Sequence, residues 1–229
     1  MLQDRGRDKK EGAPAVLKET VRAAKFVVEA GGSLIGFRRF TEEPAHTTTQ
    51  LGDGVEIRRY QPRIAAETVV VSDEEAARRI GFQRLAGYIF GGNHVAGTSA
   101  GRPVIVEHVR PGAGEKIAMT APVTQLGRSD GQWIIRFYLP ADKSLASLPQ
   151  PDDPAVSLVT VPAETLAVRR FSGGIGPQAV AAQTAALMRT LSDRGIEATD
   201  SPAAWFYDPP WTIPFLRRNE IVVPVRPVD

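Results

Sequence analysis

Most of the chain reads as short apolar and β-branched runs separated by turns that contain Pro or Gly. Such turns occur at Gln61-Pro62 and at Pro162, each between two runs. Short runs bounded by turn residues are typical of strands. The pattern predicts strands over residues 55–60, 64–71, 117–125, 133–139, 156–161, 165–171, 205–207 and 220–225.

Two longer segments are predicted to be helices. The first covers residues 73–90, with Ser72 as its N-cap and Glu75 three residues later, which is the spacing of a capping box. The second covers residues 177–194, between an initial Pro and a final Gly. Its apolar stripe has helical spacing and consists of Val180, Thr184, Leu187, Met188 and Leu191.

These elements form a repeat. The order strand, strand, helix, strand, strand occurs twice, and the two copies are offset by about one hundred residues. Strands outnumber helices and turn over through short connections, which favours an α+β fold with antiparallel pairing. We therefore predict two pseudo-twofold-related ββαββ halves that join their sheets, with a long helix from each half on the outside. A ligand is expected in a cleft between the halves.

The N-terminal part, residues 1–54, is predicted to be an extension of a domain that covers residues 55–229. Apolar residues at helical spacing predict a short amphipathic helix in it, and Thr, Gly and Pro mark residues 42–54 as a linker. Such a helix either packs on the domain or makes peripheral contact with a membrane. Residues 94–114 are predicted to be an insertion in the first half, with a strand at 103–108.

Composition narrows the classes of function. The chain has 28 basic and 26 acidic residues, and residues 1–25 alone hold seven basic and four acidic ones. The rest is near neutral, so we expect no binding to nucleic acid. The absence of Cys excludes thiolate nucleophiles and iron–sulfur clusters. Because there is neither an apolar run of about 18 residues nor a secretory signal pattern, the chain is expected to be cytoplasmic.

Five segments in fixed order resemble one known family. They are Val55–Tyr60, Gly87–Asn93, Lys116–Val123, Val168–Gly173, and Tyr207–Trp211 running on to Arg217–Glu220. Over about Val55 to Val225 the chain resembles the SOUL haem-binding protein family. The resemblance implies a distorted antiparallel β-barrel-like sheet flanked by two long helices, related to the GyrI-like effector-binding domains. It also implies non-catalytic binding of haem or another tetrapyrrole, in the role of a carrier, buffer or sensor.

The family's pocket lies along the first long helix and faces the second. By its position in the chain, Arg78 matches a basic residue that contacts a haem propionate in the family. At two further positions where the family has basic residues, this chain has Ala86 and Pro177. The apolar pocket positions fall on the same helix as Arg78, and Met188 is added from the helix that faces it. The predicted ligand-binding residues are Arg78, Phe82, Leu85, Ile89 and Met188.

The scarcity of histidine restricts the choice of an iron ligand. Haem iron is held by His, Met or Tyr side chains, among others, and the chain has three histidines. His94 directly follows the Gly-Gly-Asn turn at the end of the first helix, so it is the predicted metal ligand. His46 in the linker and His108 in the insertion are more typical of surface residues.

Two other classes of function stay open. One is an effector-type module that binds some other planar or amphipathic small molecule without iron ligation. The other is a small hydrolase in which Glu220 and Tyr207 act as base and acid, because burial in a dry cleft raises the pKa of a carboxylate. No nucleophile or nucleotide-binding motif occurs, so binding is favoured over catalysis. The aromatic cluster at residues 205–215 suits either a planar ligand or a loop that seals the core.

Overall fold

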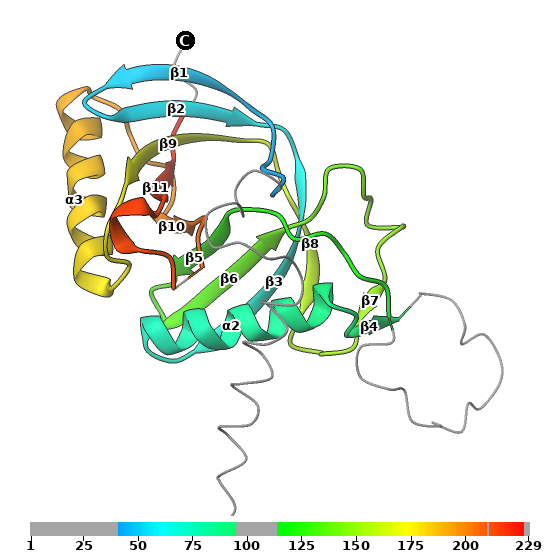
Figure 1. Cartoon of the computed structure of the whole chain (residues 1–229). Coiled ribbons are helices and arrows are strands. Elements are labelled where there is room, and N and C mark those ends of the chain that lie inside the picture. The colour runs from blue at the N-terminus through cyan, green and yellow to red at the C-terminus, as the bar shows by residue number, and fades with distance from the viewer. Residues whose placement is uncertain (1–40, 95–113, 210, 227–229) are drawn as a thin grey trace, which may run out of the picture. The chain divides into compact units, whose positions relative to one another are not determined.

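The structure is a computed structural model, and it describes residues 41–94, 114–209 and 211–226 (Figure 1). The amphipathic helix predicted near the N-terminus, the strand predicted at 103–108 and His108 lie outside these residues. In the described part of the chain, no helix is long and apolar enough to cross a membrane.

A single large sheet dominates the described residues. Its nine strands all pair antiparallel with their neighbours. In spatial order they are β1 (His46–Gly52), β2 (Val55–Tyr60), β9 (Glu164–Phe171), β11 (Asn219–Pro224), β10 (Ala203–Phe206), β5 (Val123–Gly127), β6 (Gln132–Tyr138), β3 (Arg63–Val71) and β8 (Ser157–Val161). A separate small ladder joins β4 (Asn93–His94) to β7 (Gln150–Pro151).

The strand order confirms the predicted duplication. The first half is β2, β3, α2, β5 and β6, and the second half is β8, β9, α3, β10 and β11. The equivalent strands of the two halves are β2 and β8, β3 and β9, β5 and β10, and β6 and β11. When each strand is exchanged for its equivalent, the order from β2 to β8 is reversed, so a pseudo-twofold axis passes between β10 and β5. Each half also gives its first strand to the other, because β2 pairs with β9 and β8 pairs with β3. The fold is therefore α+β with two fused halves, as predicted.

The two long helices lie where the sequence predicts them. Helix α2 spans Glu74–Ile89 and α3 spans Pro177–Asp193. The predicted N-cap Ser72 is wrong by one residue, because the Asp73 carboxylate accepts a hydrogen bond from the Ala76 backbone N–H at 2.9 Å and so caps α2. A short 3₁₀ helix, η2 (Pro214–Leu216), lies between β10 and β11.

Strand β1 corrects the prediction of a linker at residues 42–54. Thr47, Thr48 and Thr49 pair with β2, and the hairpin turns through Gly52, Asp53 and Gly54, which all have positive φ. The side chains of this edge strand are mostly exposed, so it has no apolar pattern that reveals it. The sheet of the domain therefore begins before residue 55.

The strand predicted at 117–125 is also shifted, because β5 begins only at Val123. The segment before it packs against the end of α2, where the Ile117 N–H donates to the Ile89 carbonyl at 2.8 Å. Pro122 has no N–H to give to a ladder. An apolar run is thus used for packing rather than for strand pairing.

The helices cover one face of the sheet, and each has its own apolar cluster (Figure 1). The α3 cluster consists of Val55, Ile57, Ala167, Leu187, Leu191, Ala204, Phe206, Ile221, Val223 and Val225. The α2 cluster consists of Ala66, Leu85, Tyr88, Ile89, Ile117, Ile135, Phe137, Leu139, Leu148 and Val156. Both clusters combine helix residues with every second residue of the strands below.

The other face of the sheet forms a third cluster, here called the concave cluster. It consists of Tyr60, Ala65, Tyr138, Val161, Leu166, Val168, Trp205 and Val222. These residues come from both ends of the strand order as well as its middle. Trp205 meets Tyr60 and Tyr138 edge-on, with ring centroids 5.7 and 5.9 Å apart. The sheet therefore curls around this cluster as a half-barrel, and the helices lie on its convex side.

Candidate functional site

Arg78 lies where the beginning of α2 meets the loop that leads into α3. Its Nη1 donates to Gln125 Oε1 at 3.2 Å and to the Ile175 carbonyl at 3.0 Å. Its guanidinium carbon lies 5.1 Å from the centre of the Phe206 ring. Burial lowers the pKa of Arg78, and although Glu74 and Glu75 counteract this, the positive charge of Arg217 adds to it. The guanidinium is thus held in place by neutral acceptors and has no direct carboxylate partner among the described residues.

An exposed apolar loop lies beside this position. Between β10 and β11, several large apolar side chains are more than half exposed, namely Trp211, Ile213, Phe215 and Leu216. The loop is attached to the segment before α3, because the Gly173 N–H donates to the Pro214 carbonyl at 2.8 Å. Phe215 is 73% exposed. Large apolar side chains gathered on a surface mark a binding site more often than scattered ones do.

The aromatic cluster predicted at 205–215 is therefore split between two roles. Trp205 and Phe206 are buried on opposite faces of β10, in the concave cluster and the α3 cluster. Trp211 and Phe215 point away from the core and are exposed. The first pair stabilises the fold, and the second pair is available to a ligand.

The remaining predicted pocket residues lie on the helices but differ in burial. Leu85 and Ile89 are fully buried in the α2 cluster. Phe82 is partly buried and meets Phe137 edge-on, with ring centroids 5.4 Å apart. Met188 packs against the α3 cluster from its edge. Of this set, the structure gives a partly accessible surface only to Arg78, Phe82 and Met188.

His94 is not brought together with Arg78. His94 follows the C-terminal end of α2, whereas Arg78 lies in its first turns. At 1.5 Å per residue, Arg78 and the last helical residue, Ile89, are about 16 Å apart along the helix axis. The His94 side chain is 60% exposed, and Nδ1 lies 2.7 Å from the Asp152 carboxylate. His46 stacks on Tyr60 from the edge strand. The described residues contain no group of three His, Asp or Glu side chains that could hold a metal ion.

A second polar site lies buried in the concave face, around Glu220. Arg58 donates to both carboxylate oxygens, at 2.7 and 3.0 Å, and Arg218 Nε donates to Oε1 at 2.9 Å. The Tyr207 hydroxyl donates to Oε2 at 2.7 Å. Arg58 also binds Glu56, and Arg218 also binds Glu43. The Glu220 carboxylate, with no exposed surface, therefore has four charge-assisted hydrogen bonds.

The electrostatics of this network contradict the hydrolase expectation for Glu220. Burial alone would raise the pKa of Glu220, but Arg58 and Arg218 outweigh it and hold that pKa below its usual value. Burial and the Glu220 charge together raise the pKa of Tyr207. The pair is therefore a bound carboxylate and a phenol that keeps its proton. A carboxylate so stabilised by cations is a poor general base.

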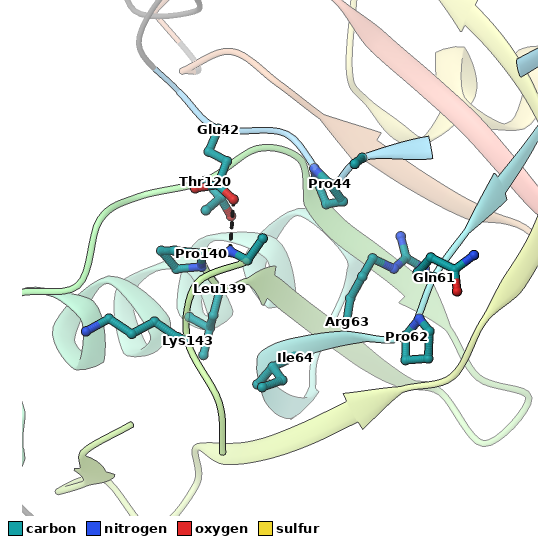
Figure 2. A pocket seen from close by; sticks show the side chains of 12 residues that line it. Glu42, Pro44, Gln61, Pro62, Arg63, Ile64, Thr120, Leu139, Pro140 and Lys143 are labelled. Carbon is teal, nitrogen blue, oxygen red and sulfur yellow. Dashed lines mark hydrogen bonds between the residues drawn. The ribbon is translucent and has the colours of Figure 1, made fainter. Parts of the chain in front are cut away.

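A cavity of about 230 Å³ lies at a third place, beside the beginning of β3 (Figure 2). Its walls come from the segment before β1, the β2–β3 turn with the beginning of β3, the segment before β5 and the residues after β6. They include Glu42, Pro62, Arg63, Ile64, Thr120 and Lys143. Ordinary ligand pockets have volumes of about 300 to 1,000 Å³. This cavity is too small for a tetrapyrrole, and none of the predicted pocket residues lines it.

The fold alone places the protein in a structural class. The curled antiparallel sheet with two outer helices is the GyrI-like fold, shared with two solved structures that cover the repeat. The crystal structure of the EcmrR C-terminal domain matches with a TM-score of 0.50 and 13% identity, over 80% of this chain and 99% of that one. EcmrR in the cryo-EM structure of an EcmrR–DNA complex matches with a TM-score of 0.53 and 12% identity, over 93% of this chain and 69% of that one.

A third similar structure is an uncharacterized conserved protein from Listeria innocua. It matches with a TM-score of 0.50 and 10% identity, over 74% of this chain and 92% of that one. No curated protein matches the chain. Identities this low establish the shared fold and nothing about ligands.

The sequence itself establishes the family. The family model described as SOUL heme-binding protein matches residues 41–224. The chain therefore belongs to the SOUL haem-binding family. The match begins before β1, in agreement with the place of that strand in the sheet.

Proposed function

We propose that this protein binds haem or a related porphyrin where α2, the loop before α3 and the Trp211–Leu216 loop meet. The observation that carries the proposal is Arg78, a half-buried guanidinium that has no carboxylate partner among the described residues and lies beside several exposed apolar side chains. A porphyrin has a flat apolar ring and propionate groups, so it complements both features. Membership of the SOUL haem-binding family supports the same ligand class.

The apolar loop supplies the area that such a ligand needs. Trp211 and Phe215 are 52% and 73% exposed. If the ligand covers about 100 Å² of apolar surface on each ring, each ring contributes about 2.5 kcal/mol to the binding free energy, at about 25 cal/mol per Å². The propionate then offers Arg78 an anionic acceptor that neutral Gln125 and the Ile175 carbonyl do not.

In this proposal the protein recognises the ring and the propionates rather than the iron. His94 lies at the far end of α2 and is bound to Asp152. Met188, the predicted ligand-binding residue on α3, has a sulfur that could bind iron, but its side chain packs against the α3 cluster. The porphyrin proposal thus shares with the effector-type alternative the absence of iron ligation, and differs from it in the ligand. Catalysis by Glu220 is not part of it, because that carboxylate is held by two arginines.

The test uses two arginines that are adjacent on the same helix. Arg78→Met removes the proposed propionate partner, whereas Arg79→Met removes an exposed neighbouring charge. We expect Arg78→Met to weaken binding of protoporphyrin IX about tenfold or more, since a hydrogen bond to a charged group contributes about 1.5 to 3 kcal/mol. Arg79→Met should change affinity less than about twofold. Fluorescence titration of the full chain measures both.

A second variant pair addresses the ring contacts. Trp211→Ser with Phe215→Ser removes exposed apolar area, and Leu145→Ser removes a 42% exposed leucine elsewhere. Because these side chains are exposed, we expect all variants to keep the melting temperature within a few degrees. Equal porphyrin affinity for the loop variant and Leu145→Ser would refute the proposed place of binding.

A further inference from the structure

The cavity beside β3 contains an unusual arginine. Arg63 begins β3, and its side chain is only 8% exposed. Its guanidinium lies between two rings of the concave cluster, 4.3 Å from the centre of Tyr60 and 4.5 Å from the centre of Tyr138. Cation–π contacts on both faces fix the plane of the group.

The hydrogen bonds of Arg63 are incomplete. Nη2 binds the carboxylate of Glu164, the first residue of β9. Nε and Nη1 are buried and have no acceptor among the described residues. A guanidinium has five N–H donors, and three of them belong to these two nitrogens. Buried donors without acceptors are rare in folded proteins, so these three point to a missing partner.

The walls of the cavity fit a partner that combines a charge with an apolar body. Its apolar lining includes Pro44, Ile64, Leu139 and Pro140 (Figure 2). The charged groups on the walls are all partly engaged, but Arg63 keeps two nitrogens without an acceptor among the described residues. Lys143 binds Glu115 at 2.9 Å, and Glu42 Oε1 accepts the Ala141 N–H at 2.9 Å. An anionic group therefore finds its best donor in Arg63.

We propose that this cavity is a binding site for a small organic monocarboxylate, whose carboxylate accepts hydrogen bonds from Nε and Nη1 of Arg63 once the wall side chains shift to expose these buried atoms, and whose apolar body fills the space beside Ile64. A volume of about 230 Å³ equals about eight water molecules, which suits a single ring or a short chain. Gln61, an exposed flexible side chain at the β2–β3 turn, is the part of the wall that moves most easily to admit it.

This site is separate from the proposed porphyrin site. Strand β3 runs from Arg63 to Val71, and α2 begins three residues later. The strand is about 26 Å long at about 3.3 Å per residue, so the cavity and the beginning of α2 lie at its opposite ends. The two ligands should bind independently, and the carboxylate proposal does not rest on the porphyrin proposal.

The test uses benzoate as the probe and benzamide as its neutral isostere, both titrated into the full chain. Side-chain ¹⁵N–¹H spectra follow the Arg63 Nε–H signal, assigned from the Arg63→Gln spectrum. We expect benzoate to shift this signal saturably and benzamide to shift it at least tenfold more weakly, because only the carboxylate gains charge-assisted hydrogen bonds. Prior saturation with protoporphyrin IX should leave the benzoate affinity unchanged.

Arg136→Gln is the matched control for Arg63→Gln. Arg136 is also a largely buried arginine on a strand and binds a single glutamate, Glu67, but it does not line the cavity. We expect Arg63→Gln to weaken benzoate binding about tenfold or more and Arg136→Gln to leave it unchanged. Ala141→Trp, which narrows the cavity without touching the Arg63–Glu164 pair, should also weaken it.

Three results would overturn the site. They are equal binding of benzamide, equal losses in Arg63→Gln and Arg136→Gln, and the absence of a saturable shift of the Arg63 Nε–H signal. If Arg63→Gln does not fold, Ala141→Trp and the wild-type spectrum, with that signal assigned by through-bond experiments, decide the question. Loss of porphyrin binding without loss of benzoate binding would reject the proposed function alone.

Discussion

The two faces of the curled sheet are made by the same strands but stabilised by different interactions. Neighbouring residues show the contrast, because Ile221 faces α3 in a wholly apolar cluster whereas Glu220 faces the concave side and binds two arginines. The same alternation places Ile57 and Arg58 on opposite faces of β2. The convex face can thus exchange one apolar group for another of similar size, while the buried charges that lie beside the apolar concave cluster must each keep a partner.

The largest expected effect comes from breaking the concave network. Glu220→Gln leaves Arg58 buried with one carboxylate fewer, and removal of one partner from a buried ion pair costs about 3–5 kcal/mol. Glu197→Gln breaks the exposed pair with Arg226 and should cost less than about 0.5 kcal/mol. Urea unfolding measures both free energies. A loss below about 1 kcal/mol for Glu220→Gln would mean that the network does not stabilise the concave face.

The same network predicts how stability depends on pH. The pKa of Glu220 is lower in the folded protein than its ordinary value, which is about 4.3 for a free glutamate. Its contribution is therefore complete above that value and is lost as the pH falls below it. We expect the wild type to lose stability more steeply than Glu220→Gln as the pH falls below about 4. Parallel curves for the two proteins would contradict the pKa shift.

The next effect concerns how closely α2 lies on the convex face. A Cβ atom at Gly81 would lie 2.3 Å from Ile135 Cγ1, and Ile135 has no exposed surface. Gly81→Ala should therefore cost about 1–3 kcal/mol through overpacking. Gly87, on the same helix, has nothing near its Cβ position, so Gly87→Ala should gain about 0.5–1 kcal/mol from helix propensity. Opposite signs in urea unfolding test this, and equal signs would contradict the close approach of α2 to β6.

The difference between the faces also explains what could be predicted from the sequence. Helical spacing located α3 and its buried Leu187 and Leu191, because one apolar partner surface gives one apolar stripe. The repeat predicted the two halves, but the exchange of β2 and β8 between them depends on long-range pairing, which no local pattern records. Strand β1 was missed because both of its faces are polar.

The sites were predictable to different degrees. The family resemblance predicted Arg78, on which the proposed function rests, since a single basic residue at a fixed helix position is visible in the sequence. It could not separate Phe82 from Leu85, because burial on one helix face depends on the strand packed against it. Arg63 had no signal of its own. Its incomplete hydrogen bonds appear only when β3, β9 and the two tyrosine rings are assembled.

The smallest effects concern the two helix starts. The Asp73 side chain caps α2, so Asp73→Ala should cost about 1 kcal/mol. Gly176 is at the same position of α3 and has no side chain to cap it, so Gly176→Ser should gain a few tenths of a kcal/mol. Thermal unfolding of both variants measures this. A gain from Asp73→Ala would show that the cap is not formed.

The most direct test of the proposed function is a titration of the wild-type full chain with haemin and with iron-free protoporphyrin IX. The Soret band follows haemin, and fluorescence follows protoporphyrin. Because the proposed contacts are made to the ring and propionates, both should bind saturably, with dissociation constants within about threefold of each other. Absence of saturable binding of either ligand below about 50 µM would contradict the account. Binding of haemin alone would contradict its central claim, since it would show that the iron is ligated.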